Sequence, residues 1–211
     1  MAERPCGRDV GRPTRTAVAV ADTVHASVHN ALHLLGVDDV IVVPEAATIL
    51  FAGGFPRVTE DAAQRSLQRA IFEVQHSLED VQAARYPERV LLCDRGTVDG
   101  AAYWPDGAAE FFATMNSTYE AELARYDVVL FFETSAVGGI RFEGGNRYRT
   151  ESNEQAIALD ARLRELWSPH PRFHLVPHST SFLRKITVGL SILESVVAEL
   201  HTGWRPATLA Q

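Results

Sequence analysis

Four short, uninterrupted runs of apolar residues recur along the chain, separated by longer segments with helical periodicity. Continuous apolar runs are typical of strands buried on both faces of a parallel sheet, whereas half-exposed strands alternate apolar and polar residues. A weaker fifth run, at 17–21, could form a first strand. The alternation predicts an α/β fold with a mostly parallel sheet, and right-handed crossovers place helices on both of its faces. The four clear runs span 40–43, 90–93, 128–132 and 173–176.

Apolar residues at helical spacing occupy the segments between these runs. Leu67, Ile71, Val74, Leu78 and Val81 share one helical face, which predicts a helix that ends before Pro87. The stretch before the first clear strand predicts a short helix, and a glycine-rich segment predicts a lid-like loop. We expect one domain over 17–201, preceded by a variable segment (1–16) and followed by a tail (202–211). The other helical stripes run through 111–126, 156–167 and 182–200, the short helix through 22–35, and the loop through 138–149.

Composition excludes several classes of protein. The 211 residues include 27 acidic and 20 basic side chains, a net charge of −7 that argues against a general nucleic-acid binder. No stretch of about 20 apolar residues predicts a transmembrane helix. The N-terminal residues lack the apolar core of a secretory signal, so we expect a cytoplasmic protein, with a mitochondrial presequence as the alternative. Cys6 and Cys93 are too few for a disulfide framework, and Cys93 is predicted to be a buried apolar residue.

The first candidate site follows the 90–93 strand, because ligands in such folds bind at the carboxyl ends of the strands. Asp94 could hold Mg²⁺ or accept a proton from an attacking hydroxyl, and Arg95 could bind a phosphate as a fork. Gly96 and Gly100 are expected to leave room for a ligand near the backbone. The alternative interpretation is that Asp94 caps the following turn and Arg95 neutralises it.

Two further candidates would lie near the same edge of the sheet. Glu45 follows the first clear strand and could join Asp94 in a magnesium or substrate-hydroxyl site; otherwise it is a helix N-terminal residue favoured by the macrodipole. Arg141, Arg147 and Arg149 lie among glycines and could close over phosphates; otherwise they belong to a solvated loop.

Three histidines, His25, His29 and His33, are spaced by four residues on the predicted 22–35 helix. Histidines at this spacing can share a metal ion. No cysteine or acidic residue, apart from Asp22, is placed to complete such a site, so a polar helix face is favoured.

Several motifs recur in an order that resembles a known family. Together they are similar to the P-loop AAA-type ATPase/kinase domain shared by NadR-like proteins and the TRPL-translocation-defect proteins, over roughly residues 40–190. The motifs are Val43-Pro44-Glu45-Ala46-Ala47-Thr48; Gly53-Gly54; Gln68-x-x-Ile71-Phe72-x-x-Gln75-x-x-x-Glu79; Asp94-Arg95-Gly96-x-x-Asp99-Gly100-x-x-Tyr103; Asn146-x-x-Arg149-x-Glu151; Glu154-Gln155-Ala156-x-x-Leu159-Asp160; Trp167-x-x-His170-Pro171; and Phe182-x-x-Lys185-Ile186.

The resemblance implies a three-layer P-loop NTPase-like fold that binds ATP or GTP with Mg²⁺. Asp94 and Arg95 would lie at the reaction centre, with the magnesium ion at Asp94, and Glu45 and Asp99 would face the second substrate. The resemblance also implies phosphoinositide as a possible partner, and the arginine-rich loop allows a protein partner as well. The lid would carry the arginines Arg141, Arg147 and Arg149.

The chain departs from this family at the phosphate-binding loop. The first strand of a P-loop protein runs into Gly-x-x-x-x-Gly-Lys-[Ser/Thr], whose lysine contacts the nucleotide phosphates. Residues 15–23 contain neither glycine nor lysine, and the single lysine, Lys185, belongs to the last predicted helix. Either the loop degenerated naturally or the gene model misreads an exon. Two functions remain open: an impaired P-loop NTPase or kinase-like enzyme, and a catalytically inactive nucleotide- or phosphoinositide-binding regulatory or adaptor module.

Overall fold

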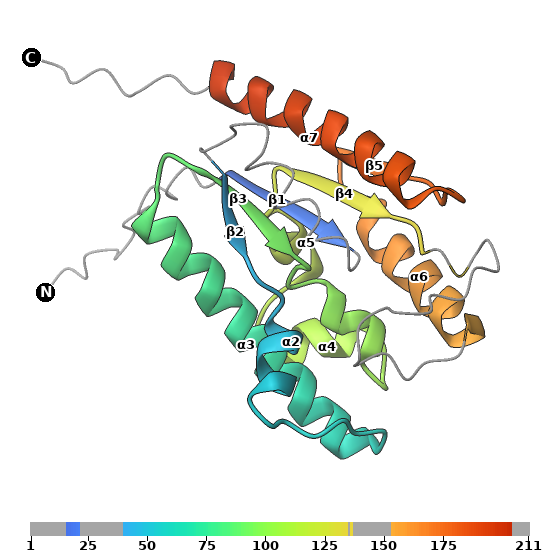
Figure 1. Cartoon of the computed structure of the whole chain (residues 1–211). Helices are drawn as coiled ribbons and strands as arrows, with labels where there is room; N and C mark the ends of the chain where they lie inside the picture. The colour runs from blue at the N-terminus through green and yellow to red at the C-terminus, as the bar shows by residue number, and fades with distance from the viewer. Residues whose placement is uncertain (1–15, 22–39, 135, 137–152, 204–211) are drawn as a thin grey trace, which may run out of the picture.

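The computed structural model describes residues 16–21, 40–134, 136 and 153–203, and these form a sheet of five strands (Figure 1). The strand order is β2-β3-β1-β4-β5, and all four neighbouring pairs are parallel. Every strand predicted from the apolar runs is present, including the weak first one. The strands are β1 (Thr16–Ala21), β2 (Val40–Val43), β3 (Val90–Asp94), β4 (Val128–Phe132) and β5 (Phe173–Val176).

Helices cover both faces of this sheet, which confirms the three-layer α/β prediction. Helices α3 to α6 lie on one side and α7 lies across the other (Figure 1). The predicted 22–35 helix, with its three histidines, and the 138–149 loop lie outside the described residues. The helices are α2 (Ala46–Ala52), α3 (Asp61–Arg85), the 3₁₀ helix η1 (Asp99–Tyr103), α4 (Ala108–Thr114), α5 (Tyr119–Leu123), α6 (Asn153–Trp167) and α7 (Phe182–Gly203).

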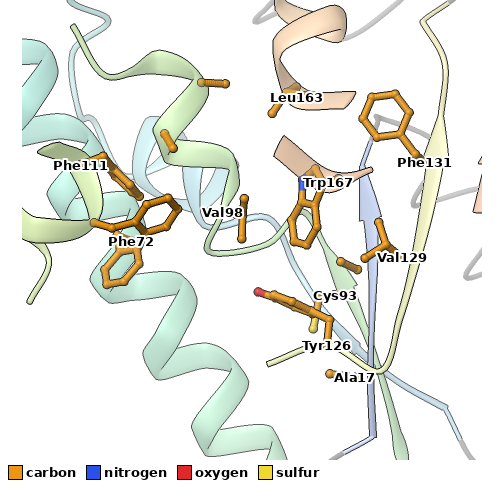
Figure 2. Packing of buried hydrophobic residues seen from close by; sticks show 14 of the residues in the cluster. Ala17, Phe72, Cys93, Val98, Phe111, Tyr126, Val129, Phe131, Leu163 and Trp167 are labelled. Carbon is orange, nitrogen blue, oxygen red and sulfur yellow. The ribbon is translucent and has the colours of Figure 1, made fainter. Parts of the chain in front are cut away.

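Alternate residues of the central strands enter two separate cores. Leu91 and Cys93 of β3 pack toward α3 and α6, whereas Leu92 packs toward α7. Cys93 is fully buried, as its apolar neighbourhood predicts. The first core is rich in aromatic rings, with Phe72 and Phe111 packed edge to face and Trp167 lying beside the sheet (Figure 2). Burial on both faces explains why these strands read as continuous apolar runs.

The prediction of a continuous helical stripe through 111–126 is wrong. Helix α4 ends at Thr114, and the backbone turns at Asn116, which adopts a left-handed φ of 51°. Helix α5 then starts afresh, because the Thr118 hydroxyl accepts a hydrogen bond from the Ala121 N–H at 3.1 Å and caps its N-terminus. The apolar spacing survives the break because both short helices pack on the same core.

The predicted apolar face of α3 is only partly correct. Leu67 is buried, but Val81 is 61% exposed. The face turned toward the protein interior includes Gln75 and Glu79, which are polar residues with partners on other elements. Apolar periodicity predicts where the helix lies in the sequence. The hydrogen-bond partners of Gln75 and Glu79 determine which side of its second half faces the protein interior.

Candidate functional site

The strand order defines where a ligand can bind. Strands β1 and β4 are neighbours in the sheet. The strand that follows β1 in sequence, β2, lies on one side of this pair, whereas the strand that follows β4, β5, lies on the other side. In open parallel sheets such a point of reversal opens a crevice at the carboxyl ends of the strands. The segments that follow β2 and β3 lie near this edge and carry Glu45 and Arg95.

A cavity of about 490 Å³ lies between these two segments and helix α3. Its volume falls in the range of sites that hold small molecules, roughly 300–1,000 Å³. Charged, amide and aromatic side chains line it together, so it can hold a ligand with both polar and apolar parts. Its lining includes Glu45, Arg95, Asp99, Gln68, Phe72 and Tyr103.

Arg95 lies between the two carboxylates of the cavity. Its Nε is 3.7 Å from Glu45 Oε1, and its Nη1 is 3.7 Å from Asp99 Oδ2. The backbone of Arg95 adopts a φ of 73°, a left-handed conformation that costs about 1–2 kcal/mol for a residue with a side chain. Its N–H donates to the Val20 carbonyl at 2.9 Å, which ties this strained turn to β1. Strain held in place in this way is frequent at functional sites.

Asp99 presents a buried carboxylate to the cavity. Its Oδ1 accepts a hydrogen bond from Trp167 Nε1 at 2.5 Å, while Oδ2 has no hydrogen-bond partner within the described ranges. Burial raises the pKa of Asp99, although the nearby Arg95 guanidinium and the Trp167 hydrogen bond oppose the shift. A ligand that donates to Oδ2 would satisfy the remaining oxygen.

Gln68 is a second polar group that faces the cavity. It is 4% exposed and lines the cavity, and its side-chain amide makes no hydrogen bond in the part of the chain that the structure describes. An amide has one acceptor oxygen and two donor hydrogens, and leaving them unpaired is unfavourable. Gln68 and Asp99 therefore form a pair of hydrogen-bonding positions for an uncharged polar ligand group.

Gly96 and Gly100 both line the cavity, as expected for backbone that leaves room for a ligand, and they also pack against the core. A Cβ at Gly96 would lie 2.8 Å from the Trp167 ring and 2.9 Å from the Tyr126 hydroxyl. A Cβ at Gly100 would lie 2.6 Å from Phe111. Protein side chains fill the space, so these glycines let the loop after β3 pack closely against the core.

Asp94 lies apart from the cavity. It ends β3, pairs in register with Val20 of β1, is 9% exposed, and is not among the residues lining the cavity. The described residues contain no cluster of three metal-ligating side chains. Magnesium bound with a nucleotide needs only one or two carboxylates, since phosphates and water complete its shell. Asp94 fits that limited donor set.

The other cations considered in the sequence analysis are Lys185 and the three arginines of the predicted lid. Lys185 is 3% exposed on α7, and its Nζ donates to the Glu133 carbonyl at 2.7 Å, so this ammonium group supports the end of β4. Arg141, Arg147 and Arg149 lie outside the described residues, and their role as a lid stays a prediction.

Sequence reasoning assigned no role to four polar residues buried at or behind the wall of the cavity. Gln75, Glu79, Tyr126 and Trp167 are all buried, and hydrogen bonds join them to the loops that carry Glu45 and Asp99. The spacing of Gln75 and Glu79 with Phe72 on one helical face was a usable signal, since polar residues on an inward face need partners.

The fold and the edge at which these groups gather are those of a P-loop NTPase-like nucleotide-binding domain. Residues 26–182 match the family model described as an AAA domain. The chain therefore belongs to the AAA domain family, of the P-loop NTPase type. A comparison with curated proteins finds no match. No helix in the described ranges is long and apolar enough to cross a membrane.

Proposed function

We propose that this domain binds a purine nucleotide, ATP or GTP, with Mg²⁺ in the cytoplasm, and that the 490 Å³ cavity receives a phosphoryl acceptor. One observation carries the proposal: Glu45, Arg95 and Asp99 converge on a small-molecule cavity at the carboxyl edge of a parallel sheet. The reaction class is phosphoryl transfer, as in an ATPase, a GTPase or a small-molecule kinase.

Each charged group has a distinct task in this proposal. A magnesium ion held at Asp94 would neutralise phosphate charge. Glu45 would accept the proton of the acceptor hydroxyl, since its carboxylate lines the cavity. Arg95 would stabilise negative charge that develops during transfer, and Asp99 would orient the acceptor through Oδ2. Arg141, Arg147 and Arg149 would close over the nucleotide.

The missing phosphate-loop lysine lowers the expected rate. Residues 15–23 lack glycine and lysine, and the chain's single lysine, Lys185, donates a hydrogen bond from its Nζ to the Glu133 carbonyl. Positioning and charge stabilisation supply most of the catalysis in phosphoryl transfer. We therefore expect nucleotide binding with weak or absent turnover.

The same lysine favours a second candidate function. Because Lys185 Nζ is engaged at the end of β4, the domain could serve as an inactive regulatory or adaptor module that binds a nucleotide, a phosphoinositide headgroup or a protein. The loop arginines would supply the phosphate contacts in that case.

Calorimetry on the purified chain tests the first proposal. With Mg²⁺, we expect saturable binding of ATP or GTP that weakens at least about tenfold in Asp94→Asn. Asp106→Asn is the matched control, because Asp106 pairs with Arg65 on the surface and does not line the cavity. Absence of nucleotide binding by the unaltered chain would overturn the proposal.

Two outcomes separate the finer alternatives. Robust turnover that Asp94→Asn abolishes would show that catalysis is not impaired. Saturable binding of inositol phosphate without nucleotide binding, lost in an Arg147→Ala/Arg149→Ala double variant, would favour the inactive module.

A further inference from the structure

The two loops that carry the charged groups of the cavity are joined behind it by hydrogen bonds that meet at one carboxylate. On one side, the Ala46 N–H, next to Glu45, donates to Gln75 Oε1 at 3.3 Å. Gln75 Nε2 in turn donates to Glu79 Oε1 at 3.1 Å. Glu79 is thereby linked to the turn between β2 and α2.

On the other side, Tyr126 completes the connection. Its hydroxyl donates to Glu79 Oε1 at 2.7 Å and accepts from the Thr97 N–H at 2.8 Å. Thr97 lies midway between Arg95 and Asp99 in the loop after β3. Figure 2 shows the Tyr126 ring next to Trp167, with its hydroxyl directed away from the strands.

The charge of Glu79 is compensated inside the protein. Glu79 is fully buried, and Arg125 donates to its Oε2 through Nη2 at 2.9 Å and Nε at 3.3 Å. Burial, followed by the charge of Glu79, raises the pKa of Tyr126 well above its usual value, so the hydroxyl keeps the proton that it donates. A fully satisfied buried network of this kind is rigid and has one geometry.

We propose that Glu79 is a positioning residue that sets the separation of Glu45 from Arg95 and Asp99 through Gln75 and Tyr126. It does not line the cavity and therefore acts through the backbone of the two loops. Its effect on catalysis rests on the function proposed above, whereas its effect on loop geometry does not. Displacement of reacting groups by about 1 Å can reduce rates by about 10²-fold, so such a residue has a large expected effect.

Tyr126→Phe tests the inference with little change in packing. It removes the acceptor of the Thr97 N–H and one donor to Glu79. Tyr119→Phe is the matched control, because it deletes a hydroxyl that donates to the Leu166 carbonyl at 2.5 Å, outside this network. We expect hydrogen exchange at the Thr97 and Ala46 amides to accelerate about tenfold in Tyr126→Phe and to stay unchanged in Tyr119→Phe.

The Ala46 amide decides the outcome, because Thr97 loses its own acceptor in Tyr126→Phe. Unchanged exchange at Ala46 in Tyr126→Phe, or equal acceleration in Tyr119→Phe, would overturn the inference. Glu79→Gln is a second variant, which keeps an acceptor oxygen but removes the charge. We expect it to accelerate the same two amides, and if it fails to fold, Tyr126→Phe still decides the outcome.

Kinetics then separate this inference from the proposed function. If the unaltered chain turns over nucleotide, we expect kcat to fall about 10- to 100-fold in Tyr126→Phe, while KM for the nucleotide changes less than about twofold. Equal effects on kcat and KM would indicate a general structural role and contradict positioning. If the unaltered chain neither binds nor turns over nucleotide, the proposed function fails, and the exchange result still decides whether Glu79 couples the loops.

Discussion

The two faces of the sheet are built from different chemistry. The face covered by α3 and α6 buries carboxylates and amides, such as Glu79 and Gln75, beside the cavity. The face covered by α7 is an apolar core of aliphatic side chains and Phe132, and Lys185 of α7 donates a hydrogen bond to the Glu133 carbonyl at the end of β4. Apolar contacts are non-directional and stabilise any close packing, whereas a buried polar group is stable only with its partner in place. Both faces bury an apolar core that stabilises the fold, but only the first adds a buried polar network that fixes geometry beside the cavity.

The largest effects are expected from truncating one buried side chain to alanine on each face of the sheet. Glu79→Ala removes the carboxylate nearest to Arg125 and the shared acceptor of Gln75 and Tyr126, and should cost about 3–5 kcal/mol of unfolding free energy. Leu193→Ala on α7 should cost a similar amount, about 2–5 kcal/mol, through the cavity that it leaves. Denaturant unfolding measures both losses. Only Glu79→Ala should also accelerate exchange at Thr97 beyond the global change, and equal patterns would remove the distinction between the faces.

The next effect concerns Glu122, which belongs to the polar face. Burial raises the pKa of Glu122, but hydrogen bonds from His76, Ser117 and Thr97 outweigh it and lower the pKa from 4.5 to about 2. Because the pKa is lowered, the contribution of ionised Glu122 to folding stability is fully present above pH 4.5 and is lost as the pH falls toward 2. The difference corresponds to about 3 kcal/mol.

Urea unfolding at several pH values measures this contribution. The loss of stability between pH 4.5 and 2 should be smaller in Glu122→Gln than in the unaltered chain. Glu120→Gln, on the exposed side of the same helix, should keep the original slope. Identical slopes in the unaltered chain and Glu122→Gln would argue against the hydrogen bonds as its source.

A smaller effect tests the apolar face. A Cβ at Gly189 would overlap the Phe132 ring, so Gly189→Ala should cost about 1–3 kcal/mol through overpacking. Gly107→Ala is a useful contrast, because a Cβ there meets nothing within 4 Å and only the φ of 86° opposes it. Thermal unfolding of both variants separates crowding from backbone strain. A Gly189→Ala variant as stable as the unaltered chain would show that α7 can shift on the sheet.

The last test concerns the direction in which Asp99 makes folding stability depend on pH. Burial, opposed by Arg95 and Trp167, raises the pKa of Asp99, so its contribution to stability is present below pH 3.8 and is lost as the pH rises through the raised value. This direction is opposite to that of Glu122. Asp99→Asn should remove this decline with rising pH from urea unfolding curves, and a decline that persists would assign it to another group.

The strands were predictable because each one is encoded by its own short run of consecutive apolar residues. Each continuous apolar run corresponds to one strand, and the predicted placement of Glu45 and Arg95 near one edge follows from the end of two such runs. Cys93 was likewise predictable from its neighbours. The edge of the sheet at which to look for chemistry therefore comes from the sequence alone.

The buried polar network could not be predicted in the same way. Glu79 is surface-like by composition, and its burial depends on Arg125 and Tyr126, which follow 46 and 47 residues later. Asp99 depends on Trp167, 68 residues away. These partners lie outside the helix, so its periodicity cannot reveal them, and the partly incorrect face of α3 has the same origin. The roles of Asp94, Arg95, Glu45 and Asp99 stay predictions for the experiments above.

The central position of β1 has a consequence for how the chain is made. It pairs with β3 on one side and β4 on the other, and the Ala17 N–H donates to Asp127 Oδ2 across 110 residues of sequence. At roughly 5–20 residues per second, a ribosome needs about 5–20 s to synthesise that interval. Until β3 emerges β1 has unpaired backbone on both edges, and until β4 emerges it keeps one unpaired edge, which is the kind of segment that chaperones shield and that aggregates when they do not. Strand β1 precedes the other described strands in the chain but is paired on both sides only after β4 is made, so folding of this domain waits for most of its own synthesis.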